Sequence, residues 1–217
     1  MMNHSWGDQA ISELGDLVPE GVLVGCSFAG GLPSPDTLPS EERPTKFLEA
    51  QNVAVEGCLR NLLKEVGIES GSVLKDESGQ RLWPAGFVGS VTHKATVVGA
   101  VLAPTYLVRA IGIDIELLAN SDGLDEELIM PEGLPVGCDS RDGIVLGFSI
   151  KESVFKAQFP LTSRSLGYSE VRLSVRQTSA SRYSGSALCS DGRLFAVRAA
   201  ILELCVVSCA LLPAGYV

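Results

Sequence analysis

Two acidic side chains at the end of an apolar run are the first residues of this chain that could do chemistry. The run covers 106–115, is typical of a buried strand, and leads into the sequence Gly-Ile-Asp-Ile-Glu at 112–116. Because side chains alternate along a strand, Asp114 and Glu116 point to the same face about 7 Å apart. Carboxylates on an apolar strand are costly unless a positive group binds them, and Mg²⁺ is a natural candidate because it takes oxygen ligands. The alternative is a strand end that reaches solvent, where neither acid needs a partner.

A third carboxylate lies on a helix predicted over 144–159. Glu152 and Lys156 are four residues apart and therefore share a helix face, close to an apolar stripe. Glu152 would complete a metal site with Asp114 and Glu116, and Lys156, one turn further on, would reach a phosphate oxygen. The alternative is an ordinary solvated ion pair, which contributes about 0.3–0.5 kcal/mol.

A cluster of hydrogen-bond donors ends the strand predicted over 87–92. Ser90 and Thr92 carry hydroxyls, and His93 and Lys94 follow directly with an imidazole and an ammonium group. Such donors suit a phosphate or pyrophosphate, and the glycines nearby allow close backbone approach. The alternative for the imidazole is a structural histidine whose hydrogen bonds are satisfied within the fold.

Hydrophobic periodicity predicts the elements that must position these groups. A helical stripe over 45–66 is followed by strands over 87–92, 96–102 and 106–116, which we expect to be neighbours and antiparallel. An acidic stretch over 121–142 is predicted to be a lid or crossover. The helix over 144–159 should end at Pro160, and the segments that follow it are predicted strands: 170–176, 186–188 and 193–207, the last split near Ala200. The predicted class is α+β, with two similar lobes, 1–118 and 119–217, each a long helix packed on a small, mostly antiparallel sheet, and the site between them.

Composition narrows the function classes. The net charge of −9 argues against nucleic acid as a partner. The chain has six cysteines, none of them in a Cys-x-x-Cys pair, and only two histidines. These are few ligands in the wrong spacing for a zinc site, so we do not expect one. Cys58, Cys205 and Cys209 lie in apolar segments and are predicted to be packed thiols. We expect a cytoplasmic protein without membrane association, because the chain shows neither a secretory signal nor an apolar stretch of membrane-spanning length.

Three segments together resemble the motifs of the 4′-phosphopantetheinyl transferases. They are Trp-Pro-Ala-Gly-Phe-Val-Gly-Ser-Val-Thr-His at 83–93, Gly-Ile-Asp-Ile-Glu at 112–116 and Lys-Glu-Ser-Val-Phe-Lys at 151–156. The likeness covers roughly 40–205 and is greatest to the two-lobed, monomeric branch that serves siderophore, polyketide and nonribosomal peptide carriers.

The resemblance implies an activity and a set of roles. Such an enzyme moves the phosphopantetheine arm of coenzyme A onto a serine of an acyl or peptidyl carrier protein and releases adenosine 3′,5′-bisphosphate. Mg²⁺, or Mn²⁺, would be held by the three carboxylates named above, and Glu152 would take the serine proton. The resemblance assigns coenzyme A phosphates to cations and donors of the chain: Arg43, Lys75, Arg81, Ser90, Thr92, His93, Lys94 and Lys156.

The chain departs from the family pattern at several positions. Gln51 and Val55 stand where relatives often carry arginines that help to bind coenzyme A, and Lys94 stands where they often carry cysteine. Two other hypotheses therefore remain open. One is a degenerate relative that binds coenzyme A or a carrier protein without turnover, and the other is a metal-dependent pyrophosphohydrolase that uses water as acceptor.

Overall fold

The computed structural model describes residues 5–29, 43–69, 71–121, 123–133, 135, 138 and 140–215. The first half contains the helices α1 (Ser5–Leu17) and α2 (Arg43–Glu65) and the strands β1 (Leu23–Phe28), β2 (Leu74–Lys75), β3 (Arg81–Leu82), β4 (Phe87–Lys94), β5 (Val97–Pro104) and β6 (Val108–Leu117). The second half contains the short helices η2 (Leu118–Ser121), α3 (Glu126–Ile129) and η3 (Tyr168–Glu170), the long helix α4 (Ser140–Thr162), and the strands β7 (Val171–Gln177), β8 (Arg182–Cys189), β9 (Leu194–Ile201) and β10 (Cys205–Pro213).

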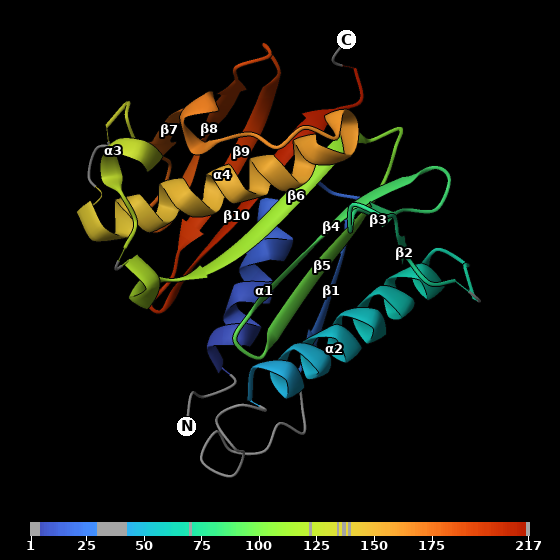
Figure 1. The fold of residues 1–217 in the computed structure, drawn as a ribbon. Coiled ribbons are helices and arrows are strands. Elements are labelled where there is room, and N and C mark those ends of the chain that lie inside the picture. The colour runs from blue at the N-terminus through green and yellow to red at the C-terminus, as the bar shows by residue number, and fades with distance from the viewer. Residues whose placement is uncertain are drawn as a thin grey trace.

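Two antiparallel sheets and the helices on them make this an α+β protein (Figure 1). One sheet has the strand order β1-β5-β4, and the other has the order β6-β10-β9-β8-β7. A small two-stranded sheet, β2-β3, precedes β4. Figure 1 shows α2 running along the three-stranded sheet and α4 lying across the five-stranded sheet.

The central strands are buried on both faces, which explains why they are apolar almost throughout. In β5, Val98 and Leu102 pack with α2, whereas Val97 and Val101 face the core that α1 covers. The strand β10 alternates in the same way between α4 and α1. The helix α1 therefore lies against both sheets, and the apolar side chains packed around it form one hydrophobic core shared by the two sheets (Figure 1).

A close approach between α4 and β6 depends on one glycine. A Cβ atom at Gly112 would lie 1.8 Å from the carbonyl oxygen of Ser153 and 2.7 Å from the backbone nitrogen of Ala157. No side chain fits there, because both neighbours are backbone atoms of the helix. Gly112 thus lets α4 lie directly on the strand that carries the two acidic residues.

The long helices and most central strands match the sequence predictions. The helix predicted over 45–66 is α2, the one over 144–159 lies within α4, and the split near Ala200 falls between β9 and β10. The prediction that Pro160 ends its helix is wrong, because α4 continues to Thr162. Near a helix end, a proline removes one backbone hydrogen bond but need not stop the helix. The hydrogen bond from Ser163 N to Phe159 O, at 2.8 Å, is still made after Pro160.

The pairing of β6 also differs from the prediction. The antiparallel pairing of β4 with β5 is confirmed, but β6 pairs with β10 and not with β5. A strand from before position 118 therefore belongs to the five-stranded sheet, so sheet membership crosses the boundary predicted between 1–118 and 119–217. Local periodicity cannot reveal this pairing, because an apolar strand fits any buried place in a sheet.

The predicted packed thiols are confirmed. Cys58, Cys205 and Cys209 are buried, and burial raises the pKa of each thiol to about 12. Such thiols stay protonated at neutral pH and fill space as small apolar groups. In the part of the chain that the structure describes, no helix is both long and apolar enough to cross a membrane.

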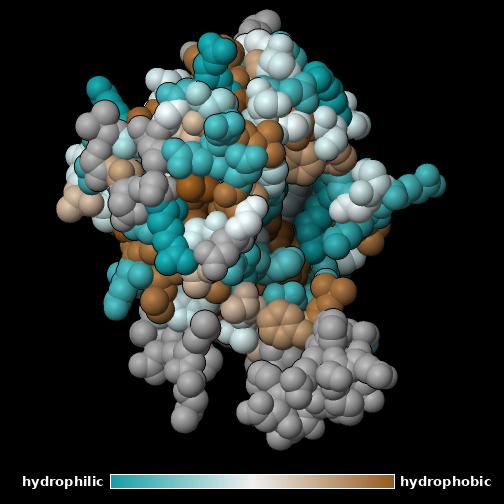
Figure 2. Space-filling model, turned by 60° about the vertical axis from the view of Figure 1, so that its left-hand side comes forward, coloured by the Kyte–Doolittle hydropathy of each residue, from teal (hydrophilic) through white to brown (hydrophobic). Residues whose placement is uncertain are grey.

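The surface is of mixed polarity. Figure 2 shows hydrophobic side chains between hydrophilic ones on the face seen there. Large apolar side chains are also exposed singly elsewhere, for example Tyr106 beyond β5 and Leu188 on β8. Scattered exposure of this kind is usual for a folded domain.

Candidate active site

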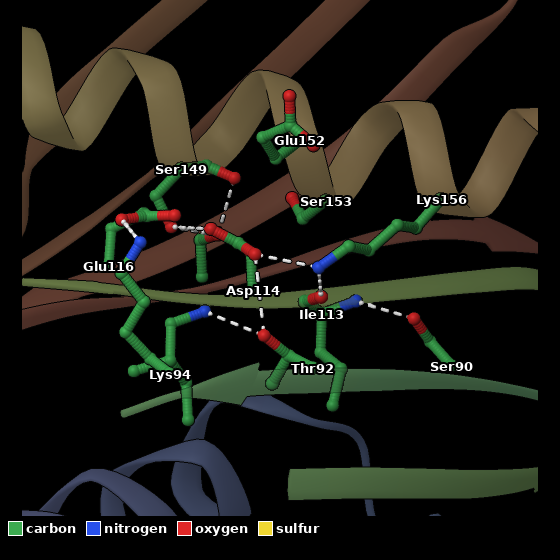
Figure 3. Close-up of polar contacts among 12 residues, drawn as sticks. Ser90, Thr92, Lys94, Ile113, Asp114, Glu116, Ser149, Glu152, Ser153 and Lys156 are labelled. Atoms are coloured by element: carbon green, nitrogen blue, oxygen red, sulfur yellow. Dashed lines mark hydrogen bonds and ion pairs between the residues drawn. The ribbon is translucent and has the colours of Figure 1, made fainter. Parts of the chain in front are cut away.

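Two side-chain hydroxyls join β4 to β6, although these strands belong to different sheets. Ser90 Oγ accepts a hydrogen bond from Ile113 N at 3.1 Å, and Thr92 Oγ1 accepts one from Ile115 N at 3.2 Å. Because both contacts advance by two residues on each strand, β4 and β6 run in the same direction here. This register brings the donor cluster at the end of β4 beside Asp114 and Glu116 (Figure 3).

Asp114 is the most buried carboxylate of the site, with 4% of its surface exposed. Its Oδ1 atom lies 2.7 Å from Lys156 Nζ and accepts a longer bond, at 3.4 Å, from Thr92 Oγ1. Its Oδ2 atom accepts from Ser149 Oγ at 3.0 Å. Hydrogen bonds and a neighbouring ammonium are what a buried carboxylate requires, and Asp114 receives them from two elements, Thr92 on β4 and Ser149 and Lys156 on α4 (Figure 3).

Ser149 and Ser208 belong to this network and were not predicted from the sequence. Both are fully buried, and their Oγ atoms lie 2.9 Å apart. Ser208 also donates to the carbonyl oxygen of Ser149 at 2.8 Å, and in the sheet it is paired with Asp114. The available signal was a hydroxyl at position 208 within an otherwise apolar strand.

Glu116 pairs with the lysine at the end of β4. Lys94 Nζ lies 2.5 Å from Glu116 Oε2, and Asn120 Nδ2 donates to the same oxygen at 3.4 Å. The side chains of Lys94 and Glu116 are 26% and 13% exposed, so the pair is largely removed from water. The contact is visible in Figure 3, where Lys94 extends to the glutamate.

Glu152 is held by a tyrosine that the sequence analysis missed. Tyr168 OH donates to Glu152 Oε1 at 2.6 Å, and the tyrosine ring packs against Phe148. Burial and this carboxylate raise the pKa of Tyr168, because both oppose a phenolate. The nearly fully buried Lys151 donates to Tyr168 O at 2.9 Å and so fixes the backbone of η3 beside the helix.

The donor set suits a hard divalent cation, although each carboxylate already has a protein partner. Asp114 and Glu116 on β6 and Glu152 on α4 offer oxygen atoms, which Mg²⁺ prefers. In the described residues, no three acidic, histidine or cysteine side chains are close enough together to hold a metal ion. The three carboxylates fit the cation by the type of their donor atoms, but in this conformation they are not gathered around one point. Lys156, Lys94 and Tyr168 contact them instead.

A cleft of about 270 Å³ opens beside this site between α2, the β2-β3 hairpin, β4 and α4. Five of the residues predicted to bind coenzyme A line it: Lys75, Arg81, Ser90, His93 and Lys156. Arg81 also donates to Glu56 Oε1 at 3.1 Å. Of the other predicted coenzyme A ligands, Thr92 contacts Asp114 and Lys94 contacts Glu116. The side chain of Arg43 lies outside the described residues.

His93 lies at the rim of this cleft with a lowered pKa. Partial desolvation of the imidazole is the larger cause, and the ammonium group of Lys156 adds to it, while Asp114 acts in the opposite sense. A lowered pKa keeps the ring neutral at neutral pH, so one ring nitrogen can donate and the other can accept.

Two of the positions that depart from the family pattern, Gln51 and Val55, have structural contacts here. Gln51 is buried and its Nε2 donates to Ala95 O at 2.8 Å, within the turn that joins β4 to β5. Ala95 has a φ of 50°, so this turn is conformationally demanding for a residue with a side chain. Val55 is buried as well and lines the cleft.

The chain shows clear sequence similarity to known proteins. Residues 53–103 match the model of the 4′-phosphopantetheinyl transferase N-terminal domain. The 4′-phosphopantetheinyl transferase PptT of Mycobacterium tuberculosis is 34% identical over 158 residues, which cover 69% of this chain and 68% of that protein.

Two further relatives match over somewhat shorter regions. The 4′-phosphopantetheinyl transferase Npt of Nocardia iowensis is 33% identical over 150 residues, 67% of this chain and 65% of that protein. Enterobactin synthase component D of Salmonella typhimurium is 32% identical over 137 residues, 58% of this chain and 53% of that protein. In this α+β fold, a buried acidic site thus lies beside a cleft lined by cationic side chains. The chain belongs to the 4′-phosphopantetheinyl transferase family.

Proposed function

We propose that this protein transfers the 4′-phosphopantetheine arm of coenzyme A to a serine hydroxyl of an acyl or peptidyl carrier protein. The observation that carries the proposal is the contact between Lys156 and Asp114, because Lys156 also lines the cationic cleft. One side chain therefore touches both the acidic site and the place where phosphates would bind.

The cations of the cleft would bind the nucleotide end of coenzyme A. Lys75 and Arg81 would take the 3′-phosphate, together with Arg43, and His93 would donate to a phosphate oxygen. Lys156 would neutralise charge on the phosphoryl group that is transferred, since positioning and charge neutralisation carry most of the catalysis in such reactions.

The acceptor serine would approach from the other side of Phe155. This residue lines the cleft and also a second hollow of about 220 Å³, whose lining includes Glu152 and Tyr168. The serine oxygen would form a bond to the phosphorus that carries the pantetheine arm, and the bond from this phosphorus to the oxygen of the adenosine 5′-phosphate would break. Adenosine 3′,5′-bisphosphate leaves, and Glu152 takes the serine proton.

Asp114, Glu116 and Glu152 would hold a Mg²⁺ or Mn²⁺ ion. When bound, such an ion supplies positive charge to the pyrophosphate. The burial of Asp114 and the oxygen ligands of all three side chains support this assignment.

The test is intact-mass spectrometry of an apo carrier protein incubated with this protein, coenzyme A and Mg²⁺, with an EDTA control. We expect a metal-dependent gain of the phosphopantetheine mass. Glu152→Gln and Lys156→Met should lower the initial rate by about 100-fold or more, since each removes a charge from the site. Glu127→Gln, at an exposed position on α3, is the matched control and should transfer at the unmodified rate.

A second candidate is a relative that binds coenzyme A without turnover. The observation in its favour is that Val55, an uncharged residue at a position where the family pattern often has arginine, lines the cleft, while Gln51 is bonded to Ala95 O. Calorimetric binding of coenzyme A without any mass gain on several carrier proteins would establish it. A wild-type rate in Glu152→Gln would instead refute the assigned role of that carboxylate.

A further inference from the structure

Lys94 contacts Glu116, one of the three carboxylates assigned to the metal. It is the last residue of β4, and the bond from Ile115 N to Thr92 Oγ1 fixes the register that brings its side chain to Glu116. Lys94 Nζ and Glu116 Oε2 lie 2.5 Å apart, which is a close ion pair. Both Lys94 and Asn120 thus bind the same oxygen, Oε2, of Glu116.

The charges of the site show why this contact matters. Two ammonium groups already contact two of the three carboxylates assigned to the metal, Lys94 at Glu116 and Lys156 at Asp114. Lys156 also donates to Ile113 O at 3.1 Å and lines the cleft, so it has partners beyond Asp114. Glu116 is the one acidic partner that the structure gives to Lys94 within the described residues. A divalent cation at Glu116 would meet this ammonium group at short range, where two positive charges repel strongly.

We propose that Lys94 competes with the divalent cation for Glu116 and thereby sets the metal affinity of the site. The inference rests on the proposed function, because it uses the metal assignment of Asp114, Glu116 and Glu152. In the metal-free protein the ammonium group of Lys94 neutralises Glu116 and so reduces the repulsion between the carboxylates of Glu116 and Asp114. Metal binding requires that this ion pair opens and that Lys94 turns toward water, so the metal affinity is lower than that of the same site without the lysine.

The competition can be measured without any enzymatic turnover. Electron paramagnetic resonance reports free Mn²⁺, so titration of the full-length protein with MnCl₂ in the absence of coenzyme A gives the dissociation constant. Lys94→Met removes the charge and keeps most of the side-chain length. We expect the dissociation constant for Mn²⁺ to fall about tenfold, which corresponds to about 1.4 kcal/mol.

Two further variants separate competition by charge from a structural effect. Lys94→Arg keeps the positive charge and should bind Mn²⁺ as weakly as the unmodified protein. Lys64→Met removes an exposed lysine of α2 and should leave the dissociation constant unchanged. Circular dichroism of each variant checks that the fold is retained. Equal or weaker Mn²⁺ binding by a folded Lys94→Met protein would overturn the proposal, as would tighter binding by Lys94→Arg.

The same titration distinguishes failure of this inference from failure of the metal assignment. Glu116→Gln should lose Mn²⁺ binding if the metal assignment is correct. If unmodified protein, Glu116→Gln and Lys94→Met all bind Mn²⁺ equally or not at all, both the metal assignment and the role of Lys94 are refuted. If Glu116→Gln loses binding and carrier modification depends on Mg²⁺, while Lys94→Met binds as the unmodified protein does, only the role of Lys94 is refuted.

Discussion

Replacing Gly112 by alanine should damage the site without removing any polar group. A Cβ atom at this position would lie 1.8 Å from Ser153 O, whereas an ordinary contact requires about 3.4 Å. The obstacle is the backbone of α4, so no side-chain rotation can relieve it, and the helix must move by about 1.6 Å, the difference between those two distances. Overpacking of this kind typically costs about 1–3 kcal/mol of unfolding free energy.

The functional loss should exceed the loss of stability. Lys156 and Ser149 on α4 hold Asp114 at 2.7 Å and 3.0 Å, and a shift of the helix lengthens both contacts. A misplacement of about 1 Å can lower an enzymatic rate about 100-fold. We therefore expect Gly112→Ala to remain folded at 20 °C but to modify a carrier protein at least about 100-fold more slowly, measured by intact mass at saturating coenzyme A.

A matched glycine separates this effect from a general effect of alanine. Gly15 lies in α1, is exposed, and a Cβ atom there meets nothing within 4 Å. Gly15→Ala should keep the full rate and gain about 0.5–1 kcal/mol of stability, because alanine is favoured over glycine in a helix. A Gly112→Ala protein with the unmodified rate and unfolding midpoint would refute the argument that this glycine sets the distance between α4 and β6.

Three further predictions concern single side chains. Gln51→Ala should lower the unfolding free energy in urea by about 1–2 kcal/mol, since it leaves Ala95 O without its donor; an unchanged midpoint would contradict that role. The pKa of Tyr168 is raised in the folded state, so the phenol loses its proton more readily in the unfolded chain. The stability that Tyr168 contributes is therefore present below the unfolded pKa near 10 and is lost as the pH rises above that value. Tyr168→Phe should lose less unfolding free energy between pH 9 and 11 than the unmodified protein does. His93, whose pKa is lowered, should titrate below 6.5 in an NMR titration. Lys156→Met should raise the pKa of His93, because the Lys156 ammonium group contributes to its lowering; a downward shift would refute this account of the cleft.

The elements of the site could be predicted from sequence because each has a strong local pattern. The helix α4 shows an apolar stripe, and β6 shows a largely apolar run with Asp114 and Glu116 near its end. These patterns result from burial, which is the same wherever the element lies in the fold. They therefore identified Asp114, Glu116, Glu152 and Lys156, and the structure brings Asp114 and Lys156 into contact.

Tyr168 and Ser208 were missed for the opposite reason. Tyr168 follows α4 in a short turn of helix, and Ser208 lies in the last strand, so neither belongs to a pattern that involves Glu152 or Asp114. Their contacts arise from the way in which η3 and β10 pack beside α4 and β6. A single tyrosine or serine has many possible partners, and only the assembled sheet selects among them.

The donors at the end of β4 show that a motif can serve assembly as well as binding. Thr92 Oγ1 accepts from Ile115 N and donates to Asp114, so its only hydrogen is already used within the protein. Ser90 Oγ accepts from Ile113 N and lines the cleft, and within the described part of the chain its hydrogen has no acceptor. Of the two hydroxyls, that of Ser90 is therefore better placed to bind a phosphate, while that of Thr92 aligns the strands. Because both contacts cross from the three-stranded to the five-stranded sheet, the acidic site can form only when the two sheets have docked.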